Sequence, residues 1–575
     1  MTVQGRYWLP LALLIGSASL MAQDQLDIRI TPANPKLLAN IQGYLGSLAE
    51  RDERSLRQFS RVAEAQAQKA AQALGYYQAQ IDSRVQGGKP PRLILEVQAG
   101  EPLRLREVDI RIEGPAAALK AFRRPASPAL APGAVLDHGH YEDAKKLILN
   151  QASRYGFFGG RFTRQRLSID PRAGVADIQL HYDSGPRYRL GAVSFEGESP
   201  FDDALLQRMV PFEPDTPYDA QRIAELDQAL QSSGYFDSVR VDASPARAQD
   251  QVIPVRVQLS PREPRTLGFG LGFSTDVGPR GRANWTRHWA NPQGHSYGAE
   301  LELSTPRQNF GLWYDIPGDP PLTDKWRFAG GYQNQAIADT DSDSRLLTLG
   351  PEWHHQLPSG WQRVLSLRYQ YEQYHLGDED GISRLLLPGV SYALLRSDNR
   401  IDPGQGYRLQ FDLAAGKQGL VSDTDLLHGD LLLKGLTTQW QDHRFLGRLQ
   451  LGGSLTGDYA AVPPSLRFFA GGDQSVRGYD YQSLSPQNRD GDRVGGRYLL
   501  AGSLEYQYSL NERWRLASFI DQGTAANSLD FGALKTGVGL GLRWVSPVGP
   551  LRLDLAHALD DEGGIRLHFS MGPEL

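Results

Sequence analysis

The chain lacks cysteine throughout its 575 residues, which excludes disulfide bonds and thiolate metal sites. Beyond the N-terminus it also lacks any apolar run close to the roughly 18 residues that a membrane-spanning helix needs, and its mean hydropathy is −0.43. The formal net charge is −5 and the pI is about 6.2, so no basic excess points to nucleic acid as a partner. A membrane β-barrel is compatible with these absences, because its strands alternate apolar and polar residues.

The N-terminus has the pattern of an export signal. One positive charge precedes an apolar stretch, residues 7–16, and small residues follow it. We expect cleavage after Ala18 or Ala22, so residues 1–22 are predicted to be a signal peptide. The alternative, a short membrane anchor, is disfavoured by the length of the stretch and by Pro10 within it.

Three segments carry a glycine followed by two aromatic residues. The glycines are Gly75, Gly156 and Gly234, spaced by 81 and 78 residues. Each ends an amphipathic helical stretch, where glycine suits a helix C-cap, and each precedes two alternating segments typical of strands. The shared motif, spacing and flanking strands favour a repeated α+β unit over three unrelated domains. The predicted domains are residues 23–102, 103–186 and 187–264.

From about residue 265 helical periodicity fades, and alternating segments of about ten residues recur between turn-rich gaps. The clearest are residues 267–274, 296–304, 326–332, 364–371, 406–413, 445–455, 498–508, 514–520, 538–544, 551–556 and 565–571. One face of such strands meets lipid and the other a wet lumen. A strand-plus-turn unit of roughly 19 residues predicts about 16 strands in a closed transmembrane β-barrel, residues 265–575. A soluble β-propeller or sandwich is disfavoured by the export signal.

A long gap between strand-like segments, residues 457–497, contains a glycine-rich motif. In it Arg477 lies between Val476 and Gly478, which suggests a turn that presents a guanidinium to a carboxylate. Two candidate carboxylates follow in strand-like segments.

Glu505 and Asp521 are these candidates. Alternation places Glu505 on the lumen face, because Leu504 and Tyr506 would face lipid. Asp521 shares a side with the apolar Phe519, so alternation alone leaves its face ambiguous. We assign Asp521 to the lumen, since a charge in lipid would be costly.

These motifs resemble those of a known family. Val476-Arg477-Gly478-Tyr479 resembles the Val-Arg-Gly-Phe/Tyr loop motif of the BamA/TamA superfamily of barrel assembly and secretion proteins. The segment from Phe519 to Gly523 resembles the family's Phe-x-Asp-x-Gly strand motif, and Asp402-Pro403 resembles a recurrent turn that enters a strand. The three repeats resemble the family's polypeptide-transport-associated (POTRA) domains, and this repeat count is most similar to the TamA branch.

The resemblance covers nearly the whole chain after the signal, and it implies a location and a partner. It places the barrel in the bacterial outer membrane and the repeats in the periplasm. It implies that the loop folds into the lumen, where Arg477 pairs with Asp521 and has Glu505 as a neighbour. It also implies a TamB-like, inner-membrane-anchored partner and unfolded outer-membrane proteins as clients.

The expected function is insertion or translocation of autotransporter-type or other barrel clients through a lateral seam. We expect the first strand to pair with the last, and the glycines of the first to weaken that pairing. An opened seam would offer edge hydrogen-bonding groups to an incoming strand. The expected seam residues are Gly268, Gly270, Gly272, Phe569 and Gly572. The alternatives are a two-partner secretion pore, which needs one large secreted substrate, and a passive outer-membrane channel, which needs no repeat domains.

No catalytic pattern accompanies these features. A nucleophile elbow in a supporting context, a phosphate loop and a cysteine cluster are all missing. His138 and His140, and the acidic segment 339–343, are expected to be solvated loop residues. We therefore expect a protein that is not an enzyme and that has no cofactor and no metal.

Overall fold

The computed structural model describes residues 25–48, 51–197, 199–336, 342–531, 534–547, 549–561, 564–572 and 574–575. The predicted signal peptide and most of the acidic segment 339–343 lie outside these residues. Two compact units are present: Met1–Ala192 with Pro214–Ile223 and Ala243–Pro254, and Val193–Glu213 with Ala224–Asp242 and Val255–Leu575. Among the described residues, no helix is long and apolar enough to span a membrane.

The first repeat is a three-stranded sheet covered by two helices. Its elements are β1 (Leu26–Thr31), α1 (Pro35–Leu45), α2 (Glu53–Ala73), β2 (Gln80–Gln86) and β3 (Arg92–Gln98), with the strands in the order β1-β3-β2. The helix α2 begins at Glu53, where the side chain of the preceding Asp52 accepts the amide of Ser55. Its small buried face, which includes Ala63 and Ala67, lets the helix lie close to Leu93 of the sheet.

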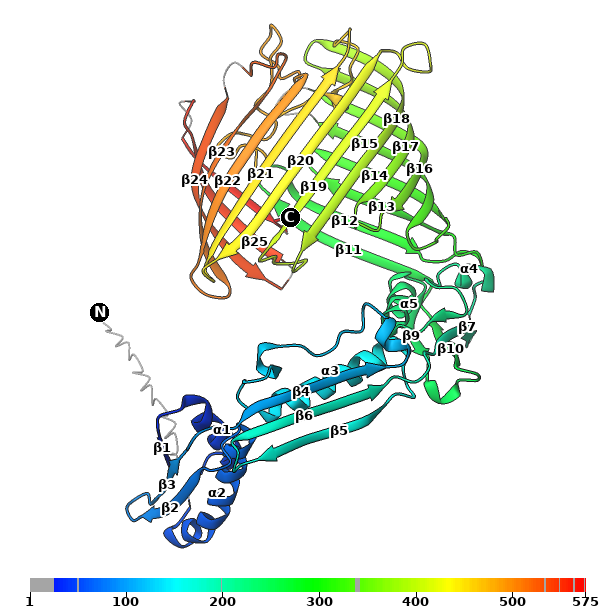
Figure 1. Ribbon diagram of the computed structural model, residues 1–575. Helices are drawn as coiled ribbons and strands as arrows, with labels where there is room; N and C mark the ends of the chain where they lie inside the picture. The colour runs from blue at the N-terminus through cyan, green and yellow to red at the C-terminus, as the bar shows by residue number, and fades with distance from the viewer. Residues whose placement is uncertain are drawn as a thin grey trace, which may run out of the picture. The chain divides into compact units, whose positions relative to one another are not determined.

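The second repeat has the same plan with one long helix. Its elements are β4 (Arg104–Glu113), α3 (His138–Tyr155), β5 (Arg161–Asp170) and β6 (Val175–Asp183), with the strands in the order β4-β6-β5 (Figure 1). Alternate residues of β6 are buried, which puts Ile178 and Leu180 against the helix side. Gly156 caps α3 in the left-handed conformation that favours glycine, with φ of 81°.

The third repeat adds a short strand and a short helix. Its elements are β7 (Arg189–Glu196), α4 (Asp203–Gln207), β8 (Thr216–Pro217), α5 (Ala220–Ser232), β9 (Phe236–Asp242) and β10 (Val252–Pro261), with the strands in the order β8-β7-β10-β9.

The repeated glycine motif lies where one repeat meets the next. Tyr77, two residues after Gly75, has its hydroxyl 2.8 Å from Nε2 of His138 in the second repeat. Gly156 packs directly on Tyr218 of the third repeat, and a Cβ at position 156 would lie 2.6 Å from the Tyr218 Cβ. The glycine spacing therefore marks the junctions between repeats as well as the helix ends.

In the third copy of the motif, the aromatic residue after the glycine also contacts the next part of the chain. Tyr235, next to Gly234, donates its hydroxyl to the carbonyl of Gly294 at 2.7 Å. Its ring also packs on Phe201, with 4.7 Å between ring centroids. Gly294 lies in the turn between the second and third barrel strands, so this motif contacts the barrel turn instead of a further repeat.

The barrel is one sheet of 16 strands in sequence order, which confirms the predicted strand count (Figure 1). The strands are β11 (Arg265–Ser274), β12 (Gly278–Arg287), β13 (Ser296–Ser304), β14 (Arg307–Pro317), β15 (Asp324–Ala336), β16 (Asp343–Gln356), β17 (Gln362–Leu376), β18 (Glu379–Ser397), β19 (Gly406–Gly416), β20 (Leu426–Gln439), β21 (His443–Leu455), β22 (Tyr498–Ser509), β23 (Trp514–Ala526), β24 (Lys535–Ser546), β25 (Gly549–Ala558) and β26 (Ile565–Met571).

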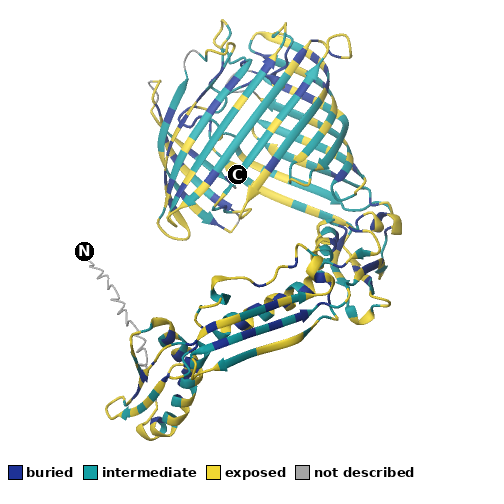
Figure 2. Cartoon of the chain, viewed as in Figure 1, coloured by how far each residue is buried: buried dark blue, intermediate teal, exposed yellow. Residues whose placement is uncertain are grey.

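The sequence predicts a weak pairing of the first strand with the last, and within the described residues the structure shows this contact at one end of β11 only. Within the described residues no hydrogen-bonded ladder joins β11 to β26, and the sheet ends at these two strands. They meet at Thr275, whose amide donates to the carbonyl of Phe569 at 3.0 Å. Because the strands are antiparallel and β26 ends at Met571, β26 has no residue opposite the first half of β11. The barrel is therefore nearly closed, and Figure 2 shows much of β11 exposed.

Candidate functional site

The segment between β21 and β22, residues 456–497, folds back onto the inner wall of the barrel. We call it the lumen loop. Isolated bridges pair Phe468 with Gly496 and Ala470 with Leu484. Its apolar residues are buried against small residues of the wall. The cluster consists of Phe468, Ala470, Val476, Tyr479, Leu484, Leu499, Ala501, Ala525 and Ala558.

Arg477 is the polar centre of this loop. Its Nε lies 2.7 Å from one oxygen of Asp521 and its NH2 lies 2.9 Å from the other, so the guanidinium grips the carboxylate with two parallel bonds. The Arg477 backbone amide also donates to Asp521, at 3.0 Å. NH1 of Arg477 contacts Glu505 at 2.7 Å and Asp554 at 3.1 Å. The three carboxylates come from three strands of the wall, since Glu505 lies on β22, Asp521 on β23 and Asp554 on β25.

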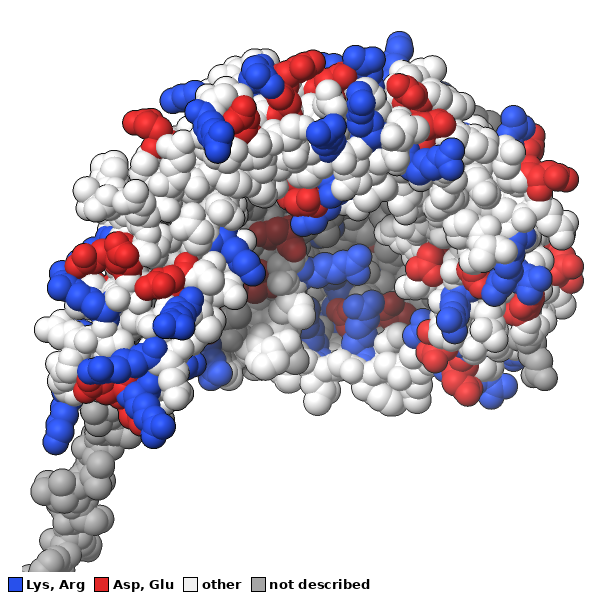
Figure 3. Space-filling model, turned by 60° about the horizontal axis from the view of Figure 1, so that its bottom comes forward, with Lys and Arg blue, Asp and Glu red and all other residues white. Residues whose placement is uncertain are grey.

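A second arginine completes the cluster from the wall side. Arg543 on β24 lies 2.8 Å from Glu505 and 2.6 Å from Asp554. Two guanidinium groups and three carboxylates are thus interleaved, with side chains no more than 9% exposed. Buried charges require this kind of mutual pairing. Figure 3 shows positively and negatively charged side chains inside a hollow on the face that is in view.

Small residues on β24 make room for the loop. A side chain at Gly537 would collide with the carbonyl of Arg477, and one at Gly539 would collide with the ring of Phe519. Phe519 faces the lumen on the same side as Asp521, as the alternating burial of β23 shows. Gly523, the last residue of the strand motif, is also on this face and lies against the carbonyl of Leu500.

The expected seam glycines lie on the lumen face of β11. Their partners on β12 are polar: Gly268 is opposite Asn284, and Gly272 is opposite Arg280. A Cβ at Gly272 would lie 2.8 Å from Nε of Arg280, whereas Gly270 has space for one. Most of these glycines therefore give room to polar side chains of the neighbouring strand.

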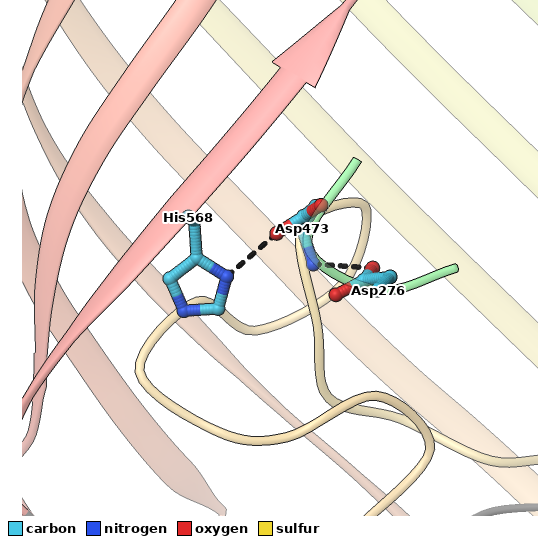
Figure 4. Close-up of side chains that lie close together, drawn as sticks. All are labelled: Asp276, Asp473 and His568. Carbon is cyan, nitrogen blue, oxygen red and sulfur yellow. Dashed lines mark hydrogen bonds and ion pairs between the residues drawn. The ribbon is translucent and has the colours of Figure 1, made fainter. Parts of the chain in front are cut away.

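Asp276, Asp473 and His568 gather where the lumen loop meets the seam (Figure 4), and Thr275 also binds Asp473. Asp473 of the loop accepts hydrogen bonds from Nδ1 of His568 on β26, at 2.6 Å, and from the hydroxyl of Thr275, at 2.8 Å. Its backbone amide donates to Asp276 at 2.7 Å. Asp276, Asp473 and His568 bring one possible metal-ligand atom each to within 4.8 Å of one another. Nε2 of His568 accepts the amide of Gly478 at 2.9 Å, so both ring nitrogens are engaged and we assign no metal here.

A second charged cluster holds the segment after β26. Glu574 lies 2.6 Å from NH2 of Arg444 on β21 and accepts a hydrogen bond from Gln507 on β22 at 2.8 Å. Asp402, from the Asp402-Pro403 turn, binds the same Arg444 at 3.0 Å and Arg515 at 2.6 Å. Side chains from three strands, one turn and the end of the barrel thus meet at one point. Gly572, the expected seam residue before Glu574, has φ of 135°.

The structure brings together several of the expected site residues and adds others. It places Val476, Gly478 and Tyr479 beside Arg477, and it joins Arg477 to Asp521, Glu505 and Phe519. Among the described residues, no strand pairing joins the seam glycines of β11 to Phe569 of β26. The sequence reasoning missed Arg543, Asp554, Asp473, His568 and Glu574. The first two had a usable signal, since each is a charge flanked by apolar residues in an alternating strand.

Known protein families match this arrangement. A model described as the Omp85 superfamily domain matches residues 255–574. A model described as POTRA domain TamA domain 1 matches residues 27–99, and a POTRA model described as surface antigen variable number repeat matches residues 188–262.

The outer membrane protein assembly factor BamA of Nitratidesulfovibrio vulgaris is 24% identical in an alignment of 459 residues, and the match covers 74% of this chain and 56% of that protein. BamA of Neorickettsia risticii is 23% identical in an alignment of 417 residues, and the match covers 68% of this chain and 55% of that protein. The chain thus spans little more than half the length of these relatives. The solved structure of BamA from Haemophilus ducreyi lacking POTRA domains 1–3 shares the fold, with a TM-score of 0.66 and 16% identity, over 82% of this chain and 99% of that one.

The Omp85 match extends over more than half of the chain, and the POTRA matches precede it in the order of the fold. The chain belongs to the Omp85 superfamily and is an outer-membrane β-barrel with POTRA domains on its N-terminal, periplasmic side.

Proposed function

We propose that this protein inserts or translocates other outer-membrane proteins through the seam between β11 and β26. The observation that carries the proposal is the edge of β11, which among the described residues has no strand partner along most of its length and offers backbone donors and acceptors beside an exposed apolar face. Phe269 is 78% exposed and Leu271 is 87% exposed on that face. An incoming strand can pair with such an edge while its apolar side chains stay in lipid.

The lumen loop weighs against a passive channel. Its apolar residues are buried on the wall, and Arg477 is bound by three carboxylates, so the loop occupies space that a steady pore would leave open. A loop bound inside the lumen and a wall with a largely unpaired edge among the described residues together favour a lateral route over an axial one.

We further propose a TamA-like role, with autotransporter-type clients and a TamB-like inner-membrane-anchored partner. The model for the first TamA POTRA domain matches residues 27–99, which supports this branch of the family. Edge strands of the repeats, such as β2 and β5, offer sites for a partner to add a strand. Co-purification of the full chain from membranes, followed by identification of bound proteins, tests this part of the proposal. A partner without an inner-membrane anchor would contradict it.

Site-specific photocrosslinking tests the lateral route. A photoreactive phenylalanine analogue replaces Leu271 on β11, and a matched variant carries it at Leu540 on β24, where the side chain is 68% exposed. During assembly of an unfolded barrel client in vesicles, we expect crosslinks to the client from position 271 and few from position 540. Equal yields from both positions would mean that clients do not use this seam.

A further inference from the structure

The first and last strands of the barrel are joined through the lumen loop. Thr275 and Phe569 exchange two hydrogen bonds across the seam, and side chains from both strands also bind Asp473. One oxygen of this carboxylate, Oδ1, accepts from Thr275 at the end of β11 and from His568 on β26. One loop residue therefore touches both sides of the seam.

The hydrogen bonds around Asp473 are mutually consistent. The Thr275 hydroxyl donates to Asp473 and accepts the amide of Phe569 at 3.0 Å, so it uses its single proton once. The neutral His568 ring donates from Nδ1 to Asp473 and accepts at Nε2 from Gly478. The group closes into one connected network of loop, first hairpin and last strand, as Figure 4 shows for its three titratable members.

We propose that Asp473 is a positioning residue that clasps the end of β11 to β26, so that release of the lumen loop from the wall also lets these two strands separate. The contacts that form the clasp do not depend on what the barrel transports. The effect of the clasp on client entry rests on the proposed function.

The glycine before Asp473 fits this role. Gly472 has φ of 101°, and a Cβ at that position would lie 2.6 Å from an oxygen of Asp276. The carboxylate of the first hairpin thus sits against the bare backbone of the loop, where it accepts the amide of Asp473. A side chain at position 472 would push the hairpin away from the loop.

The clasp is built to be releasable. The Asp473 side chain is only 2% exposed, and within the described residues its second oxygen, Oδ2, has no hydrogen-bond partner. A buried carboxylate oxygen without a partner raises the free energy of the closed state, and water satisfies it once the seam opens. The network therefore holds the two strands together without making the closed seam deeply stable.

Spin labels across the seam test the proposal in the full chain. The protein has no cysteine, so labels at Leu271→Cys and Leu567→Cys are the only ones attached. Both side chains are exposed, at 87% and 54%. In this labelled parent, we expect one narrow distance distribution by pulsed electron resonance in nanodiscs.

Two substitutions in the labelled protein remove contacts of the clasp, and a third serves as a control that leaves the clasp intact. Asp473→Ala removes the shared acceptor, and Thr275→Val removes the hydroxyl while keeping the branched shape. The control is Asp480→Ala, because the exposed Asp480 pairs with Arg566 of β26 at 2.9 Å and reaches only one side of the seam. Heat-modifiable migration on gels shows that each barrel has folded.

We expect Asp473→Ala and Thr275→Val to add a population at longer distance that is at least several-fold larger than in the parent, and Asp480→Ala to match the parent. Unchanged distances in both clasp variants would overturn the proposal, as would equal broadening in the control. If Asp473→Ala fails to fold, Thr275→Val alone decides. A wider seam with unchanged client assembly would count against the proposed function and leave the clasp standing, because the distances and the assembly are measured separately.

Discussion

The guanidinium of Arg477 lies over the ring of Phe519, with Cζ 3.4 Å from the ring centroid. Phe519 and Asp521 are neighbours on the lumen face of β23, so one strand supplies both an aromatic surface and a carboxylate to the same arginine. A planar cation suits this combination, because it stacks on the ring while its edge binds the carboxylate.

Replacing Arg477 tests the charged cluster. Among the described residues, Arg477→Ala leaves the buried Asp521, Glu505 and Asp554 with Arg543 as the remaining arginine in direct ion-pair contact, and Arg543 reaches two of the three, so we expect the barrel to lose about 3–5 kcal/mol of stability. Arg477→Lys should recover part of the loss, since a lysine cannot make the two parallel bonds. Denaturant unfolding in detergent micelles measures both. The control is Arg493→Lys in the same loop, where the guanidinium donates to a backbone carbonyl; equal losses at the two positions would contradict this account.

The Glu574 cluster predicts a second effect. Glu574→Gln removes the ion pair with Arg444 and keeps the shape, so we expect a loss of about 1–3 kcal/mol. Hydrogen exchange of the β26 amides should also become faster, because this contact anchors the chain just after that strand. The exposed Glu512, in the turn between β22 and β23, gives the matched control Glu512→Gln. Unchanged exchange in Glu574→Gln would show that the contact does not restrain the strand.

The junction between the first two repeats predicts a pH effect. Burial lowers the pKa of His138 below 6.5, whereas the unfolded chain takes up that proton near pH 6.5. The unfolded state therefore binds more protons in this window, and stability falls as the pH drops below about 6.5 towards the lowered pKa. Limited proteolysis of the periplasmic repeats at pH 7.5 and 5.5 measures this.

His138→Gln should remove much of that pH dependence, whereas His140→Gln, two residues away and more exposed, should retain it. A variant with Gln at position 138 that keeps the full pH dependence would show that other groups cause it.

The second junction predicts a steric effect. Gly156→Ala puts a side chain in the left-handed region and also 2.6 Å from Tyr218, so repeats two and three must shift. Gly133→Ala has the same backbone cost, with φ of 89°, but no neighbour within 4 Å. We expect about 1–2 kcal/mol of destabilisation at Gly133 and clearly more at Gly156. Thermal unfolding of the periplasmic repeats in the full chain compares the two, and equal effects would contradict the packing argument.

The sequence predicted site residues best where a single charged residue lies among the apolar residues of a strand or motif. Asp521 could be placed in the lumen because lipid does not tolerate a carboxylate, and Arg477 stood out in its motif. Alternation gives the face of a residue but not its register. Asp554 reaches Arg477 because it lies opposite Gly541 on β24, a pairing set by a turn whose geometry the sequence does not specify.

The alternation of apolar and polar residues did not reveal a strand where the lumen loop covers the wall of the barrel. Strand β18 has the apolar run Leu385-Leu386-Leu387, which does not alternate, and it was not predicted. Leu385 and Leu387 are fully buried against Val462 and Leu466 of the lumen loop. A wall that the loop covers needs apolar residues on both faces, so its strands lose the pattern of a wet barrel. The other unpredicted strands were β12, β14, β16 and β20.

Locking the seam tests the central claim most directly. The rings of Phe273 and Phe569 lie 5.8 Å apart across it, so Phe273→Cys with Phe569→Cys introduces a reversible crosslink into a chain without cysteine. The control pair is Leu431→Cys with Leu451→Cys, which are register partners on the neighbouring strands β20 and β21. In an assay of client assembly into vesicles, oxidation should stop assembly by the seam pair, reduction should restore it, and the control pair should be unaffected by either. Full assembly by the oxidised seam pair would contradict a lateral route.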